Sequence, residues 1–202
     1  ARLLVSDADL TPAAMKLLAN RRVQQFKNDP LFKSRLDIQP IPNFSRAIFL
    51  AAPHRGTEFA DRWFTLAARK VIRLPGAFLG ALTDVIQSSD PDLQAFIKDV
   101  DNGLIQNGPS DLSKNSNFTR LTKNVVPYKG MKFHSIMGNA TKSNDLNIIT
   151  DDVVPYTSAH LDGALSEKII KGGHSIQETP EAVLELRRIL RLHLTELGLY
   201  KP

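Results

Sequence analysis

The stretch RAIFLAA at residues 46–52 is a short, unbroken apolar run that stops at Pro53. A run of this length and composition is typical of a strand buried on both faces of a parallel sheet. Two further strands are predicted downstream, MKFHSIMG at residues 131–138 and EKIIK at residues 167–171. Because predicted helices separate these strands, the chain has the alternating pattern of an α/β fold with a mostly parallel sheet.

The segment between the first two predicted strands, from Thr57 to about Ser116, differs in character from the rest. Gly and Pro residues divide it into stretches with the apolar periodicity of helices, so we interpret it as a helical insertion. Apolar residues of helices most often form a packed core. In a cap above a site they can also bind a hydrophobic substrate, and the candidates for that second role are Phe59, Trp63, Phe78 and Leu82.

Helices are also predicted on both sides of this insertion. Residues 1–7 suit the tail of a helix that begins upstream, and Thr11-Pro12 can serve as the N-cap and first position of a helix over residues 13–26. Residues 118–125 suggest a further short helix. The last helix opens at Thr179-Pro180, and its predicted apolar face consists of Val183, Leu186, Ile189, Leu190 and Leu194.

Three strands are too few for a complete sheet of this class. The run at residues 46–52 is apolar enough to be central, and a central strand needs a neighbour on each side. The first residue is Ala1 rather than an initiator Met. We therefore expect the missing strands in an upstream N-terminal segment or in a separate chain.

Length and composition limit the classes of function. The 202-residue chain is long enough for one domain, residues 1–202, with a core of its own. Its net charge is +5, but the basic residues are scattered and not interleaved with aromatics, so no nucleic-acid partner is predicted. No apolar run reaches membrane-spanning length, so no transmembrane segment is predicted. Cysteine is absent, which excludes disulfides, thiol nucleophiles and cysteine metal ligands.

A metal site is not favoured by the remaining residues. The chain has no H-E-x-x-H motif and no close cluster of His and carboxylate residues with ligand spacing. Oxygen ligands for calcium could come from one polar region, but a plain polar loop is the preferred interpretation. That region contains Asn144, Asp145, Asn147, Asp151 and Asp152.

A carboxylate and a histidine follow the second and third predicted strands. Asp151 opens the turn DDVVP at residues 151–155, and His174 lies in the glycine-flanked segment GGHS at residues 172–175. An acid followed by a histidine is the order of the second and third members of a Ser…Asp…His triad. Asp152 stays open as an alternative acid. Taken alone, Asp151 could belong to an exposed turn, and His174 could be an ordinary surface histidine. The presence of both residues in this order favours a catalytic acid and base.

The first member of such a triad is missing, because no G-x-S-x-G motif occurs in the chain. Four segments nevertheless resemble, in order, the lipase and esterase group of the α/β-hydrolases. Residues 1–6 resemble the helix after the nucleophile elbow, and IFLAAPHRGT at residues 48–57 resembles the strand and turn with a T/A-P-H-x-G segment. Residues 151–155 resemble the D-G-V-V-P acid turn, with Asp152 at the usual Gly position, and residues 173–175 resemble the G-H-S base loop.

The resemblance implies the C-terminal part of an α/β-hydrolase fold that begins just after the nucleophile elbow. It implies a serine-hydrolase-type carboxylic ester hydrolase with Asp151 as the acid, His174 as the base and a nucleophilic serine upstream. The insertion at about residues 57–116 would be a helical cap. His54 would line the pocket or, more often in such a position, support it structurally. The substrate would be a small-molecule or lipid ester, no cofactor is implied, and this chain alone is not expected to hydrolyse esters.

A different class of function remains open at this stage. The chain could be a non-catalytic α/β-hydrolase-like module that binds a protein or a lipid through the helical insertion. The missing serine supports this alternative, whereas the acid turn and the base loop speak against it, since a binding module has no need for either. The sequence immediately upstream of Ala1 would separate the two hypotheses.

Overall fold

The structure, a computed structural model, describes residues 1–17, 30–63 and 110–201. The chain divides into two compact units. The first unit comprises Ala1–Ala8, Ile38–His54 and Val125–Pro202, and the second comprises Asp9–Asp37 and Arg55–Asn124.

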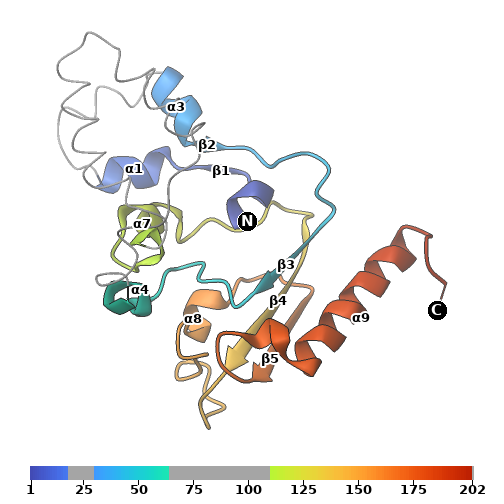
Figure 1. Cartoon of the computed structure of the whole chain (residues 1–202). Helices are drawn as coiled ribbons and strands as arrows, with labels where there is room; N and C mark the ends of the chain where they lie inside the picture. Colours follow the sequence, from blue (N-terminus) through green and yellow to red (C-terminus); the bar gives the residue numbers. More distant parts are fainter. Residues whose placement is uncertain (18–29, 64–109, 202) are drawn as a thin grey trace. The chain divides into compact units, whose positions relative to one another are not determined.

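The centre of the first unit is a parallel sheet of three strands, β3 (Arg46–Leu50), β4 (Lys132–Asn139) and β5 (Ser166–Lys171). Their order in the sheet is the order in the chain, and both pairs of neighbours are parallel. Figure 1 shows the three strands side by side with helix α9 (Pro180–Glu196) beside them. The prediction of a mixed α/β protein with a parallel sheet is therefore confirmed.

The first predicted strand, β3, has one described neighbour. Among the described residues β4 is the central strand, and its residues 133–138 are all buried. In β3 only Phe49 is buried, because the structure describes a neighbour on just one side of that strand. The burial of residues 46–52 on both faces, which was expected with a further strand beside them, stays a prediction. The strand also ends earlier than predicted, because Ala51 has a positive φ of 45°.

Successive residues of β4 face opposite sides of the sheet, as in any strand. Ile136 belongs to a buried cluster on the α9 side, whereas Phe133 belongs to a second cluster with Val5 on the other side. The first cluster consists of Ala51, Ile136, Ile170, Ile176, Ala182 and Ile189. The core of the first unit is thus a pair of apolar layers separated by the sheet.

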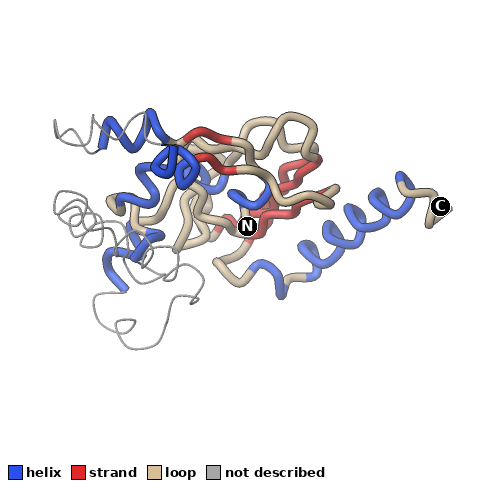
Figure 2. Tube along the Cα trace, turned by 90° about the horizontal axis from the view of Figure 1, so that it is seen from above, coloured by secondary structure: helices blue, strands red, loops and turns tan. Residues whose placement is uncertain are grey.

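Helix α9 was predicted at the correct place, but its buried face is different. The Thr179 side chain accepts a hydrogen bond from the Ala182 backbone N–H, and Pro180 opens the helix. The spacing of three and four residues turns Ala182, Glu185 and Ile189 inward. Three members of the predicted apolar face, Val183, Leu190 and Leu194, are exposed instead. Figure 2 shows α9 as one uninterrupted helix along the sheet.

Short elements complete the first unit. The N-terminal residues form a 3-10 helix, η1 (Arg2–Val5), rather than the tail of an α-helix, and Ser6 directly after it is extended. Helix α8 (Tyr156–Ala159) follows the aspartate turn, and the 3-10 helix η5 (Ile176–Glu178) precedes α9. Two-residue strands, β1 (Ala8–Asp9) and β2 (Asp37–Ile38), each have one residue in the first unit and one in the second, and they pair with each other.

The described helices of the second unit are short. They are α1 (Thr11–Leu17), α3 (Pro30–Leu36), α4 (Glu58–Trp63), η4 (Ser110–Leu112) and α7 (Asn117–Thr122). Thr11 is the first residue of α1 rather than its N-cap, because its N–H donates to the Asp9 carboxylate at 2.8 Å. The part of the predicted insertion at residues 64–109 lies outside the described residues. No described helix is both long and apolar enough to cross a lipid bilayer.

Candidate active site

The carboxylate of Asp151 is buried and held by the turn that it opens. One oxygen, Oδ1, accepts the backbone N–H of Val153 at 2.9 Å and that of Val154 at 2.6 Å. The side chain is only 1% exposed. The turn is tied to the end of β4, because the Ala140 N–H donates to the Thr150 carbonyl. Two fixed donors on one oxygen set the orientation of the carboxylate and leave its other oxygen, Oδ2, available.

That second oxygen meets His174. The distance from Asp151 Oδ2 to His174 Nδ1 is 2.8 Å. An ionised carboxylate can only accept, so Nδ1 is the donor in this contact, and in the neutral ring the lone pair is on Nε2. The imidazole is 45% exposed, in contrast to its acid partner. The arrangement therefore provides a basic nitrogen at the surface with its tautomer fixed from behind, which is the arrangement of a general base.

The structure distinguishes the two neighbouring aspartates. Asp152 is exposed and has a positive φ of 75°, and its backbone N–H donates to the Thr150 hydroxyl. The carboxylate that reaches His174 belongs to Asp151. A positive φ is the conformation that favours glycine.

The residues predicted to contact substrate are only partly described. His54 is buried, and its ring packs edge-to-face on Phe49 with 4.7 Å between centroids. Phe59 is half-buried within α4, where its N–H donates to the Thr57 hydroxyl, and Trp63 is the last residue of that helix. Phe78 and Leu82 lie outside the described residues.

A second histidine cluster was not identified from the sequence. The Nδ1 of His160 lies 2.6 Å from Glu167 Oε2, and its Nε2 lies 3.1 Å from Asp162 Oδ1. Tyr156 stacks on the imidazole and donates its hydroxyl proton to Glu167 at 2.6 Å. Burial and the nearby Glu167 carboxylate raise the pKa of Tyr156 to about 12. The spacing of Tyr156 and His160, four residues apart in a helical turn, was the available signal.

Burial lowers the pKa of His160, but the hydrogen bonds to Glu167 and Asp162 outweigh it and raise that pKa overall. This imidazole lies between two carboxylates, which favour its charged form. A cationic histidine has no lone pair with which to take a proton. The cluster therefore joins α8 to β5 and is not a second candidate for a base.

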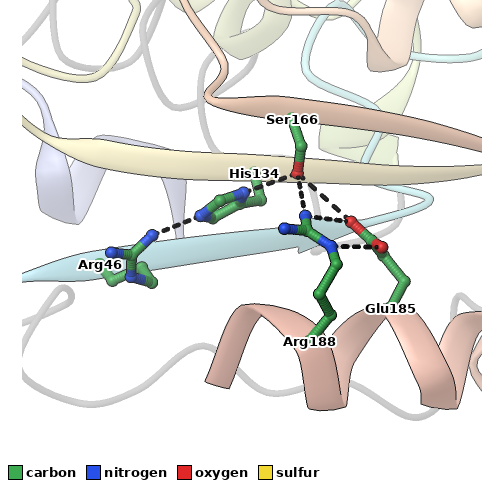
Figure 3. Close-up of polar contacts among 5 residues, drawn as sticks. All are labelled: Arg46, His134, Ser166, Glu185 and Arg188. Atoms are coloured by element: carbon green, nitrogen blue, oxygen red, sulfur yellow. Dashed lines mark hydrogen bonds and ion pairs between the residues drawn. The ribbon is translucent and has the colours of Figure 1, made fainter. Parts of the chain in front are cut away.

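A third histidine lies in a buried polar network at the start of the strands (Figure 3). Arg46 Nη1 donates to His134 Nε2 at 2.5 Å, and His134 Nδ1 lies 2.7 Å from the Ser166 hydroxyl. On α9, Glu185 forms a bidentate pair with Arg188, which also donates to Ser166. The residues come from all three strands and from α9.

The Ser166–His134 contact has the composition of a nucleophile and its base but the wrong electrostatics. Burial, followed by the charges of Arg46 and Arg188, lowers the pKa of His134. Because Arg46 donates to Nε2, the proton of the neutral ring lies on Nδ1 and points at Ser166. A ring that donates to the serine cannot take the serine proton, so this network is structural.

A metal centre is not formed by the described residues, which contain no group of three or more His, Asp or Glu side chains placed to hold an ion. The pair of Asp151 and His174 is thus the arrangement in the described part of the chain that suits proton transfer.

No family model and no curated protein matches this chain. Among solved structures, the chain is similar to the crystal structure of Bacillus licheniformis lipase BlEst2 in its mature form. The identity is 16%, the match covers 89% of this chain and 75% of that chain, and the TM-score is 0.29. What the structure defines by itself is a mixed α/β protein with a parallel sheet and a buried aspartate behind an exposed histidine.

Proposed function

We propose that these residues are the acid-and-base part of a serine-hydrolase-type carboxylic ester hydrolase with an α/β-hydrolase fold, and that the nucleophilic serine lies upstream of Ala1. The observation that carries the proposal is the contact of 2.8 Å between Asp151 Oδ2 and His174 Nδ1. A purely structural pair would have no need for an exposed imidazole whose second nitrogen is left with a lone pair.

In this mechanism the upstream serine oxygen attacks the ester carbonyl carbon while His174 Nε2 takes the hydroxyl proton. The bond from that carbon to the alkoxy oxygen then breaks, and His174 returns the proton to the departing alcohol. Water then attacks the acyl carbon in the same way, and its proton passes through His174 to the serine oxygen. The carboxylic acid is released and the serine is restored. Asp151 holds the tautomer and stabilises the imidazolium that forms twice in each cycle. The oxyanion donors would come from the residue after the serine and from an earlier loop.

The substrate contacts are a second part of the proposal. An apolar cap at about residues 57–116 would take the acyl part of a small-molecule or lipid ester. Phe59 and Trp63 are the described members of the proposed set, and Phe78 and Leu82 complete it. His54, buried against Phe49, would form part of the pocket wall.

The test is to join the chain to the segment that precedes it in its natural protein and to assay short-chain and long-chain aryl esters. The joined protein should be active, and the 202-residue chain alone should not be. Asp151→Asn should lower kcat on the order of 10³- to 10⁴-fold, because the asparagine cannot hold the productive tautomer. His174→Ala should abolish most of the activity.

The neighbouring Asp152 provides the matched control. Asp152→Asn makes the same chemical change one residue away on an exposed side chain, so it should leave kcat within a few-fold of the parent. Equal losses in both variants would contradict the assignment of Asp151. Inactivity of the joined protein on every ester, despite a G-x-S-x-G motif, would favour the binding module over the enzyme.

A further inference from the structure

Gly138 lies where the central strand meets both halves of the candidate site. It is buried near the end of β4, in register with Ile170 of β5. A methyl group in place of its hydrogen would lie 2.8 Å from Asp151 Cβ, 2.8 Å from the Gly172 carbonyl oxygen and 2.8 Å from Ile176 Cγ2. Real Cβ atoms essentially never approach other heavy atoms so closely, so any side chain here must move at least one of these groups.

The three contacted groups belong to the acid turn, the base loop and the start of η5. The acid turn is fixed by the donors from Val153 and Val154 to the Asp151 carboxylate. The base loop is fixed because the Gly172 N–H donates to the Asn139 carbonyl at 3.0 Å. Ile176 is fully buried. The Gly172 oxygen is a backbone atom and Asp151 Cβ is bonded directly to the backbone, so neither can yield by a side-chain rotation. Ile176 Cγ2 could move only by rotation of a fully buried side chain.

We infer that Gly138 is a positioning residue for the Asp151–His174 pair: the absence of a side chain lets the acid turn and the base loop both close on the end of β4, and this sets the distance between carboxylate and imidazole. The catalytic meaning of this inference rests on the proposed function, but the geometric statement does not. A residue with a side chain at this position should push the turn and the loop apart.

Gly173 provides a matched control, because it is the glycine next to His174 itself. A methyl group there would meet nothing closer than the Asp151 carbonyl oxygen at 3.7 Å, which is an ordinary van der Waals contact. The change from Gly to Ala is chemically the same at both positions. It is crowded at Gly138 and accommodated at Gly173.

The experiment observes the imidazole protons of His174 by NMR in the 202-residue chain with ¹⁵N-labelled histidine. A ring N–H held by a carboxylate exchanges slowly with water and resonates at low field. The parent and Gly173→Ala should show this Nδ1–H signal. Gly138→Ala should lose it or shift it, although its far-UV circular dichroism should stay unchanged. Assignment comes from its absence in His174→Gln.

A second variant separates positioning from simple overpacking. Gly138→Ala/Ile176→Leu removes the Cγ2 methyl at nearly constant side-chain volume, so it relieves the contact with Ile176 and leaves those with Asp151 and Gly172. Its thermal midpoint should recover towards the parent while the His174 signal stays lost. Recovery of both together would overturn the inference, as would a parent-like signal in Gly138→Ala or a failure of both variants to fold.

Activity gives a further readout in the protein joined to its upstream segment. Gly138→Ala should lower kcat about 10²-fold, the cost expected of a misplacement near 1 Å, with KM little changed. Gly173→Ala should stay within a few-fold. If the NMR result holds and the joined protein is inactive on all esters, the positioning role stands and the proposed function fails.

Discussion

Asp152 shows how a residue can be adjacent to a site in sequence and remain outside its chemistry. Aligned motifs and the order of the predicted strands favoured Asp151, and the structure brings that carboxylate to His174. The reason could not be read from the sequence, since both aspartates suit a turn. It lies in the backbone: a positive φ at Asp152 turns its side chain to solvent, and the two donors from Val153 and Val154 capture Asp151.

This backbone conformation gives a prediction for Asp152. Asp152→Gly should leave the free energy of unfolding within about 0.5 kcal/mol of the parent, because relief at φ 75° offsets the greater freedom of glycine in the unfolded chain. Asp152→Val should cost about 1–2 kcal/mol, since a β-branched residue tolerates positive φ poorly. Urea unfolding measures both, and equal stability of the two variants would contradict the assigned backbone strain.

Histidines illustrate the limit of sequence reasoning at the residue scale. The sequence pairs His174 with Asp151, and the two side chains are in contact, whereas no sequence pattern indicated the carboxylate partners of His160. Its partners Glu167 and Asp162 come from a strand and a turn whose meeting depends on tertiary structure. Composition alone could not have placed two carboxylates on one imidazole.

At the scale of elements, periodicity located α9 well but not its rotation about its own axis. Leucines lie on more than one side of this helix, so the apolar pattern did not define one face. The side of α9 that faces the sheet carries the polar network, in which Glu185 and Arg188 contact Ser166 (Figure 3). A charged residue on the buried side is invisible to a search for apolar stripes.

Two adjacent residues of α9 test its orientation. Ile189 is fully buried and Leu190 is 53% exposed, although the sequence predicted both for the same face. Ile189→Ala should lower the free energy of unfolding by about 2–5 kcal/mol through lost burial and a cavity. Leu190→Ala should change it by no more than about 0.5 kcal/mol. Denaturant titration of the two variants measures both changes. A larger loss of stability in Leu190→Ala than in Ile189→Ala would mean that the helix is rotated about its axis.

At the scale of the whole molecule, His134 and His160 make stability depend on pH in opposite directions. The pKa of His134 is lowered from 6.5 in the folded state, so its contribution is full above that pH and is lost as the pH falls through the folded pKa. The groups facing this ring are Arg46 from β3, Ser166 from β5, and Arg188 and Glu185 from α9, with Glu196 behind Arg46.

His134→Gln should therefore flatten the loss of thermal stability below about pH 6.5, since glutamine can accept from Arg46 and donate to Ser166 without titrating. His193→Gln removes a histidine of α9 that takes no part in these contacts. Its thermal midpoint should fall with decreasing pH as that of the parent does. If the thermal midpoint of His134→Gln falls below pH 6.5 as steeply as that of the parent, carboxylates and not this imidazole cause the loss of stability.

The sign is reversed for His160, whose pKa is raised from 6.5. Its contribution is full below that pH and is lost as the pH rises through the folded pKa. His160→Gln should flatten the fall in thermal midpoint on the alkaline side and leave the acid side alone. Together, the two histidines should give the parent chain a maximum of stability close to pH 6.5. A thermal midpoint that only rises or only falls with pH would contradict this account.

The parallel sheet also sets an order of events during folding. The contact between His134 and Ser166 joins residues 32 apart in the chain, whereas that between Arg46 and His134 joins residues 88 apart. Closing the longer loop costs about 0.9 kcal/mol more in chain entropy, and such non-local pairing slows folding. Strands β4 and β5 should therefore pair first, and β3 should join the sheet last. When the complete chain refolds, Asp151 and His174 would therefore be brought together on that early pair of strands before β3 joins the sheet.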